Sequence, residues 1–214
     1  MNIIDFFVQN HVTILKSLLR HLELVGISIS IGIIISIPLG ILLTRHKAAA
    51  GPVLAIAGTI QTIPGLVMLG FALVLIGIGL LPAVIVLTLY AILPILRNTY
   101  TGITEVDKGL IEAARGIGMT NLQRLFKVEI PLALPTIISG IRISTVYIVS
   151  WATLAGLIGA GGLGDLIWTG LSTYNTNYIL AGAVPSAILA FILSGLVGIV
   201  QKSLTPHGIR RVRV

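Results

Sequence analysis

A glycine-rich stretch at the end of the fourth hydrophobic segment contains two motifs that are associated with chemistry. Residues 159–164, GAGGLG, satisfy GxGxxG, and residues 162–165, GLGD, satisfy GxGD. A dinucleotide site needs a preceding strand and a later acidic residue for the ribose, and neither accompanies this stretch. An intramembrane aspartyl protease needs two aspartates that share a proton, but the other aspartates, Asp5 and Asp107, lie outside the hydrophobic segments. We therefore exclude both activities.

Other catalytic and metal-binding patterns are missing from the sequence. It contains no cysteine, which excludes disulfides, thiolate metal sites and cysteine nucleophiles. Its four histidines lie outside or at the edges of the hydrophobic segments, and neither HExxH nor GxSxG occurs. These motifs supply the residues for metal or serine hydrolysis. We expect a chain that is not an enzyme and has no metal or cofactor of its own.

The longest polar stretch, residues 104–131, has the pattern of two short helices. Thr104 with Asp107 indicates a helix start, and Gly116 and Gly118 indicate a break. A capping-box pattern of Thr120 with Gln123 then opens a second short helix that runs toward Phe126. A solvated loop is the simplest alternative. A DNA-binding helix-turn-helix is excluded, because hydrophobic segments adjoin both ends and would keep either helix out of a major groove. A docking surface for a cytoplasmic protein fits better.

This stretch resembles the EAA signature of permease subunits in binding-protein-dependent ABC importers. Glu112-Ala113-Ala114 is followed by Gly118 and, after nine intervening residues, by Val128-Glu129-Ile130-Pro131, where the family pattern has I-x-L-P. The resemblance implies an all-α, type I ABC importer permease fold with a cytoplasmic coupling helix that seats in an ATPase. It assigns coupling to the residues that match the motif: Glu112, Ala113, Ala114 and Gly118.

The composition requires a membrane protein. Hydrophobic residues make up 56% of the 214 residues, charged residues make up 10%, and the mean hydropathy is +1.05, which excludes an ordinary soluble domain. A membrane-spanning helix needs about 20 apolar residues. Five stretches meet this demand, near residues 22–44, 53–77, 80–100, 134–158 and 178–201.

Positive charges orient the predicted spans. Eleven of the fourteen Lys and Arg residues flank the spans on one side, two lie on the other side, and Arg142 lies inside the fourth span. The positive-inside rule then places the N-terminus outside and the C-terminus in the cytoplasm. We expect a multi-pass protein of a bacterial plasma membrane.

Two features refine this plan. Residues 1–20 have apolar residues at helical spacing and are expected to form an amphipathic helix in the interface, separate from a transmembrane domain over 21–202 and a basic tail over 203–214. Kinks are expected at Pro64 and at the Gly77/Gly79 pair.

Two stripes of small residues repeat every four positions, which lets helix backbones approach closely. We favour packing within the chain for both stripes, with a contact to a second subunit as the alternative for one. The stripes are Ser28, Gly32, Ser36 and Gly40 in the first span and Ser186, Ala190, Ser194 and Gly198 in the last.

The fourth span has a face that suits a quaternary ammonium substrate. Ser144, Tyr147 and Trp151 share this face with Gly140, and aromatic rings attract such cations. Packing or interfacial positions for Tyr147 and Trp151 are the alternative. The candidates for the substrate path are Gln61, Tyr90, Ser144, Tyr147 and Trp151, with Thr62 as a further one.

The glycine-rich stretch is expected to break the backbone at the outer end of the fourth span and to begin a short helix over 165–171. We expect Asp165 to cap that helix rather than attract cations, and Arg142 to be structural rather than an inner gate. The candidate gate or hinge residues are Gly159, Gly161, Gly162 and Gly164.

The sequence of residues 158–171, IGAGGLGDLIWTGL, resembles that of permeases in the osmoprotectant branch of these importers, which takes up glycine betaine, carnitine and choline. The resemblance implies a second permease chain, identical or homologous, two ATPase subunits that bind ATP, an extracytoplasmic binding protein, surrounding lipid and no nucleic acid. A permease of the same fold for methionine, taurine or another solute is one alternative. An ATP-independent channel or scaffold is another.

Overall fold

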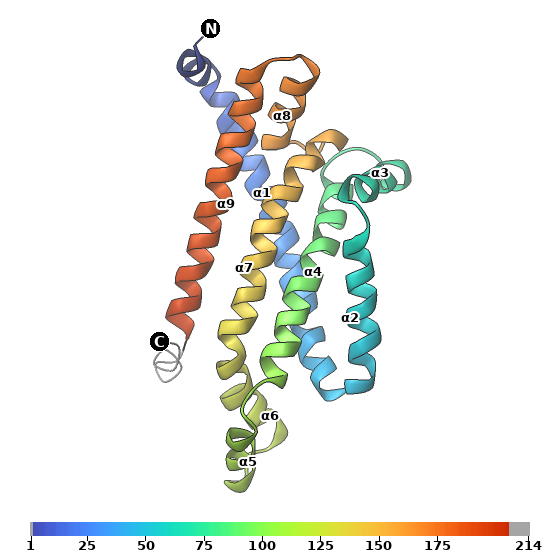
Figure 1. The fold of residues 1–214 in the computed structure, drawn as a ribbon, viewed down its shortest axis with the longest axis vertical. Helices are drawn as coiled ribbons and strands as arrows, with labels where there is room; N and C mark the ends of the chain where they lie inside the picture. Colours follow the sequence, from blue (N-terminus) through green and yellow to red (C-terminus); the bar gives the residue numbers. More distant parts are fainter. Residues whose placement is uncertain (1, 206–214) are drawn as a thin grey trace.

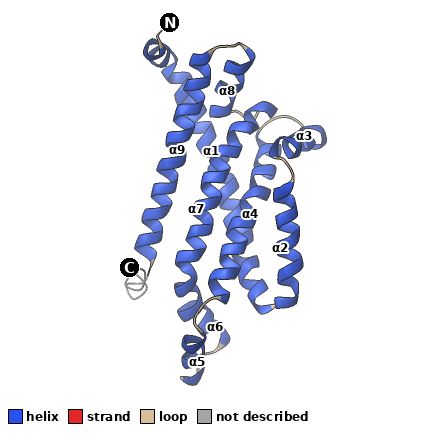
Figure 2. Cartoon of the chain, viewed as in Figure 1, coloured by secondary structure: helices blue, strands red, loops and turns tan. Residues whose placement is uncertain are grey.

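The computed structural model describes residues 2–205, and the part of the expected basic tail from 206 to 214 lies outside this range. The described residues form helices and connecting loops with no strand (Figure 2). The α-helices are α1 (Ile3–Arg45), α2 (Lys47–Thr62), α3 (Gly65–Ile76), α4 (Leu80–Thr104), α5 (Lys108–Gly116), α6 (Asn121–Arg124), α7 (Ile130–Ala155), α8 (Leu163–Ser172) and α9 (Thr176–Leu204); a π-helical turn, η1 (Leu125–Glu129), and a 3-10 turn, η2 (Gly156–Ile158), flank α7.

Four helical stretches are long and apolar enough to cross a membrane, and the bent pair α2 and α3 makes a fifth crossing if it is one span. The all-α fold with about five spans is thereby confirmed. The N-terminus lies at one end of the bundle with α3 and α8, whereas α9 runs toward the opposite end, beyond which α5 and α6 project (Figure 1).

Helix α4 is the centre of the bundle, and the small-residue stripe of α1 packs on it. Two-thirds of the residues in its most apolar stretch are buried inside the bundle. A Cβ at Gly40 would lie 2.8 Å from Cβ of Thr99, and one at Gly32 would lie 3.0 Å from Cβ of Ala91. The Ser36 hydroxyl also donates to the carbonyl of Ile92 (3.2 Å). The stripe therefore serves packing within the chain, as favoured.

The stripe of α9 meets α7 through Arg142. The guanidinium Nε donates to the Ser194 hydroxyl (2.9 Å), and a Cβ at Gly198 would lie 3.6 Å from Arg142 Cζ. A small residue at position 198 thus leaves room for the long side chain between the two helices. Arg142 links α7 to α9, which supports its expected structural role.

The N-terminal segment expected over residues 1–20 is continuous with the first span. Residues 3–45 form one helix of 43 residues, about 65 Å long at 1.5 Å per residue. Phe6 is buried against Leu163, Leu166 and Ala181, and its ring makes an edge contact with Tyr178 (4.8 Å between centroids). Packing on α8 and α9 supports the first turns, so the helix has no reason to end at residue 20.

The expected kinks are confirmed. Helices α2 and α3 meet at 91°, with Ile63 and Pro64 in extended backbone between them. A proline cannot donate a helical hydrogen bond and disfavours helix at the preceding residue. Gly77 and Gly79, at φ +110° and +116°, then reverse the chain into α4. Helix α3 therefore lies across the end of the bundle (Figure 1).

Candidate coupling site and transport path

Helix α5 begins as the sequence predicts and presents two different faces. The Asp107 side chain accepts a hydrogen bond from the backbone N–H of Leu110 (3.1 Å), which caps the helix. One face, with Lys108, Ile111, Glu112 and Arg115, lines a cavity. On the remaining surface Leu110 and Ile117 are exposed, by 48% and 75%. Of the predicted coupling residues, Glu112 faces the cavity, Ala113 is exposed and Ala114 is buried.

The glycine turn after α5 is formed by hydrogen bonds between residues that are close together in the chain. Gly118 has φ +80°, a region that residues with a Cβ rarely adopt. Its N–H donates to the Arg115 carbonyl (2.9 Å). Thr120 and Gln123 then exchange both hydrogen bonds of a capping box. The predicted turn and the start of the second helix are confirmed.

The second helix does not end as expected. After one turn of α6 the chain passes through η1 directly into α7. The N–H of Ile130 donates to the Leu125 carbonyl, five residues back. A π-helical turn here is consistent with Pro131, which lacks an N–H for a normal helical bond and crowds the carbonyl four residues earlier. Residues 121–158 consequently form one continuous helical stretch.

A buried ion-pair cluster joins this stretch to α1. The Glu129 side chain is only 4% exposed and pairs with Nε of Arg124 (2.8 Å). Its other oxygen pairs with Arg45, the last residue of α1. From the sequence, Glu129 was identified only as a position in the part of the EAA signature over residues 128–131. A single acidic residue between apolar neighbours, beside basic helix ends, was the signal that could have identified it.

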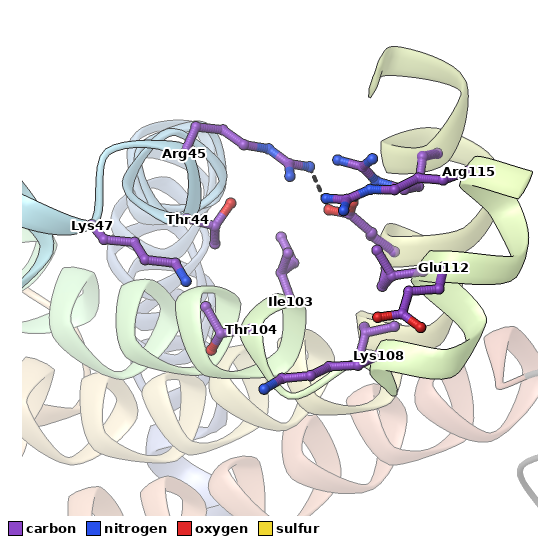
Figure 3. A pocket seen from close by; sticks show the side chains of 12 residues that line it. Thr44, Arg45, Lys47, Ile103, Thr104, Lys108, Glu112 and Arg115 are labelled. Carbon is purple, nitrogen blue, oxygen red and sulfur yellow. Dashed lines mark hydrogen bonds and ion pairs between the residues drawn. The ribbon is translucent and has the colours of Figure 1, made fainter. Parts of the chain in front are cut away.

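The cavity behind α5 has a volume of about 300 Å³. Figure 3 shows Arg45 and Lys47 on one side and Lys108, Glu112 and Arg115 on the other. The turn between α1 and α2, the end of α4 and helix α5 therefore meet around one polar space.

At the other end of the bundle, most of the predicted path residues form an internal cluster. Tyr90 of α4 stacks on Trp151 of α7, with ring centroids 4.9 Å apart and planes at 19°. The Gln61 amide donates to the Tyr90 carbonyl (3.1 Å), and the Tyr90 hydroxyl donates to the Ile63 carbonyl. A Cβ at Gly65 would lie 1.8 Å from the Trp151 ring. This cluster holds the break between α2 and α3 against the core.

Tyr147 is not part of that cluster. Its side chain is exposed (49%), whereas Ser144 is buried and donates to the Ala91 carbonyl of α4 (3.1 Å). The expected aromatic face of α7 is therefore divided: Trp151 stacks on Tyr90 of α4, and Tyr147 remains on the surface of the chain. Thr62 is exposed as well.

The glycine-rich stretch breaks the backbone where expected. Gly159, Gly161 and Gly162 all have positive φ. Gly164 lies within α8, where a Cβ would be 2.1 Å from the Thr153 carbonyl oxygen. Arg20 of α1 donates to the Ala160 carbonyl (3.1 Å). The turn is thus compact and tied to α1.

Asp165 is not the helix cap that was expected, because α8 begins at Leu163 with Gly162 as its cap. With Trp168 and Thr169 it lines an open cavity of about 480 Å³. Burial raises the pKa of the Asp165 carboxyl above its ordinary value, and the nearby Arg20 charge opposes this shift. An acidic group beside an aromatic ring suits a cationic ligand.

Comparison with known proteins identifies the family. Residues 32–207 match the family described as binding-protein-dependent transport system inner membrane component. The chain is 44% identical to the choline transport system permease protein OpuBB of Bacillus subtilis strain 168, over 99% of this chain and 98% of that one. It is 46% identical to the carnitine transport permease protein OpuCB of Listeria monocytogenes, over 99% and 97% of the two chains.

A solved structure agrees with the fold. An inward-facing structure of the MetNI methionine ABC transporter matches with a TM-score of 0.80 and 27% identity, over 90% of this chain and 96% of that one. Both the helical architecture and the sequence place the chain in one group: it belongs to the family of binding-protein-dependent transport system inner membrane components.

Proposed function

We propose that this chain is the membrane-spanning subunit of an ATP-driven importer and forms the path for quaternary-amine osmoprotectants. The observation that carries the proposal is the likeness, over nearly the whole chain, to permeases named for choline and carnitine transport. A further relative from Bacillus subtilis, 46% identical over 91% of this chain, is named for glycine betaine, carnitine and choline.

The partners follow from the family. A binding-protein-dependent permease works with a substrate-binding protein and with ATPase subunits, so we assign ATP binding and hydrolysis to two partner ATPases. A second permease chain, identical or homologous, would complete the path. The end of the bundle with α5 and α6 would face the cytoplasm, because most positive charges flank the spans there, and the N-terminus would lie outside.

The contacts around α5 support a route for coupling. A displacement of α5 by an ATPase would be transmitted in two directions. One runs through η1 into α7, since residues 121–158 are a continuous helical stretch. The other runs through the Glu129 cluster to the end of α1. Glu112, Ala113, Ala114 and Gly118 would form the moving part.

The exposed face of α7 supports a position for the path. Tyr147 is half-exposed on a helix that packs on α4 and α9, so in a pair of permease chains its ring would be available to a cation, at about 0.5–2 kcal/mol. Tyr90, Trp151, Gln61 and Ser144 would then shape the wall behind it. Gly159, Gly161, Gly162 and Gly164 would act as the hinge at the outer end.

The proposal is tested by uptake into proteoliposomes that contain this chain and its genomic-neighbour partners. We expect ATP-dependent, saturable uptake of labelled glycine betaine that carnitine or choline inhibits and methionine does not. Inhibition by methionine alone would instead favour a permease for that amino acid. A chain that binds no ATPase would overturn the coupling assignment and favour a channel or scaffold.

A further inference from the structure

The cavity behind α5 carries an excess of positive charge. Five basic side chains line it, together with two carboxylates, Glu112 and Glu129. Glu129 is already engaged by Arg45 and Arg124. Among residues 2–205 no ion pair joins the remaining basic side chains, Lys47, Lys108 and Arg115, to a carboxylate. The cavity therefore favours an anionic ligand.

The position of the cavity indicates that it lies at the membrane surface. Its walls are the turn between α1 and α2, the end of α4 and the inner face of α5 (Figure 3). Those helix ends are the ends of the predicted spans, where lipid headgroups lie. The exposed Leu110 and Ile117 remain available for an ATPase outside the cavity.

An apolar groove adjoins the cavity. It has a volume of about 550 Å³ and is lined by Pro38, Ile41 and Leu42 of α1 and by Leu122, Leu125 and Phe126 of the α6–η1 stretch. Arg45 and Arg124 line both spaces, so the polar cavity and the apolar groove meet at the Glu129 cluster. A cationic space joined to an apolar one matches a ligand with an anionic head and a hydrocarbon tail.

We propose that an anionic phospholipid binds here, with its phosphate among Lys47, Lys108 and Arg115 and one acyl chain in the groove. Basic pockets between membrane helices on the cytoplasmic side bind such headgroups. The headgroup would connect the α1–α2 turn to α5, so that the bound lipid holds the coupling helix in place. This inference does not depend on which solute is transported.

The test offers the detergent-purified full-length chain an equimolar mixture of phosphatidylglycerol and phosphatidylcholine and counts bound lipids by native mass spectrometry. We expect preferential retention of phosphatidylglycerol, reduced roughly five-fold or more by Lys47→Gln or Arg115→Gln. Lys127→Gln is the matched control, because Lys127 is an exposed residue of η1 that does not line the cavity, and it should retain the preference. Near-ultraviolet circular dichroism verifies that each variant is folded.

Three outcomes would overturn the proposal. Equal retention of the two lipids would show that the cavity does not select an anionic headgroup. Displacement of the lipid by millimolar inorganic phosphate would identify a site for a free anion rather than for a lipid. Cavity variants that keep the lipid preference but no longer co-purify with the ATPase would assign the charges to the subunit interface.

Discussion

At the end of the bundle with α5 and α6, a buried carboxylate, Glu129, pairs with Arg124 and with Arg45, which lies 84 residues away in the chain. At the opposite end, Trp151 stacks on Tyr90 and covers Gly65. The first end depends on charge compensation and helix caps, and the second depends on aromatic packing over residues without side chains. Substitutions that remove charge should therefore disturb the first end, and substitutions that add volume should disturb the second.

The largest effect is expected from Glu129→Gln. Two arginines would lose their counter-charge, and Arg124 is only 6% exposed. Breaking a buried ion pair on one side costs about 3–5 kcal/mol, so the thermal unfolding temperature of the purified chain in detergent should fall clearly.

Glu105→Gln is the control, since Glu105 is exposed at the end of α4. The double variant Arg124→Met with Glu129→Leu should recover part of the loss, because apolar groups replace the paired charges. If Glu129→Gln unfolds at the wild-type temperature, charge compensation does not hold this end together.

At the opposite end, Gly65→Ala should destabilise the chain by about 1–3 kcal/mol, the usual cost of overpacking. The new Cβ would lie 1.8 Å from the Trp151 ring, which would have to leave its stack on Tyr90. Tryptophan fluorescence and thermal unfolding report both effects.

Gly58→Ala tests whether added volume is the cause. Gly58 is a helical residue of α2 with open space around it, so this change should be neutral or slightly stabilising. The pair Gly65→Ala with Trp151→Phe should be more stable than Gly65→Ala alone. No recovery would argue against the ring contact as the origin.

Gly118→Val should act mainly on transport. A β-branched residue at φ +80° costs about 1–3 kcal/mol of backbone strain and would change the turn between α5 and α6. If that strain disfavours the coupled arrangement, uptake should decrease about 5–150-fold while membrane insertion persists.

Gly116→Val is the matched control, because Gly116 ends α5 at negative φ with no atom within 4 Å of its added Cβ. Uptake and ATPase activity are measured together for both variants. Normal uptake by Gly118→Val would remove the glycine turn from the coupling mechanism.

The smallest effect concerns Asp165. Its folded-state pKa is raised above the ordinary value of 3.8, so the stability it contributes is fully present below that ordinary value and is lost as the pH rises through the raised pKa. Asp165→Asn should therefore become slightly more stable than the wild type at neutral pH and lose this advantage in acid. Thermal unfolding at several pH values checks this, with Asp5→Asn as the control. An advantage that persists in acid would contradict the assignment.

Short-range features could be predicted from the sequence, and long-range contacts could not. The cap at Asp107, the glycine turn and the capping box at Thr120 each join residues three apart or fewer in the chain. The end of the second helix was mispredicted, because a π-helical turn carries the chain past the expected stop.

The division of the α7 aromatics has a similar cause. Helical periodicity placed Tyr147 and Trp151 on one face, but it does not say which neighbour each ring meets. In the structure, Trp151 packs against Tyr90 of α4 and Gly65 of α3. The continuation of the first helix through residue 20 likewise depends on distant residues, because Phe6 packs on α8 and α9.

The sequence by itself determined that the chain is an all-helical membrane protein that carries the EAA pattern, because hydropathy, charge asymmetry and the EAA spacing are properties of neighbouring residues. Only the tertiary structure decided which residues hold the two ends. The cluster of Glu129 with Arg45 and Arg124, the stack of Trp151 on Tyr90 and the cationic cavity behind α5 join segments that are far apart in the chain. Their energies depend on burial and distance, which exist only once the helices have packed.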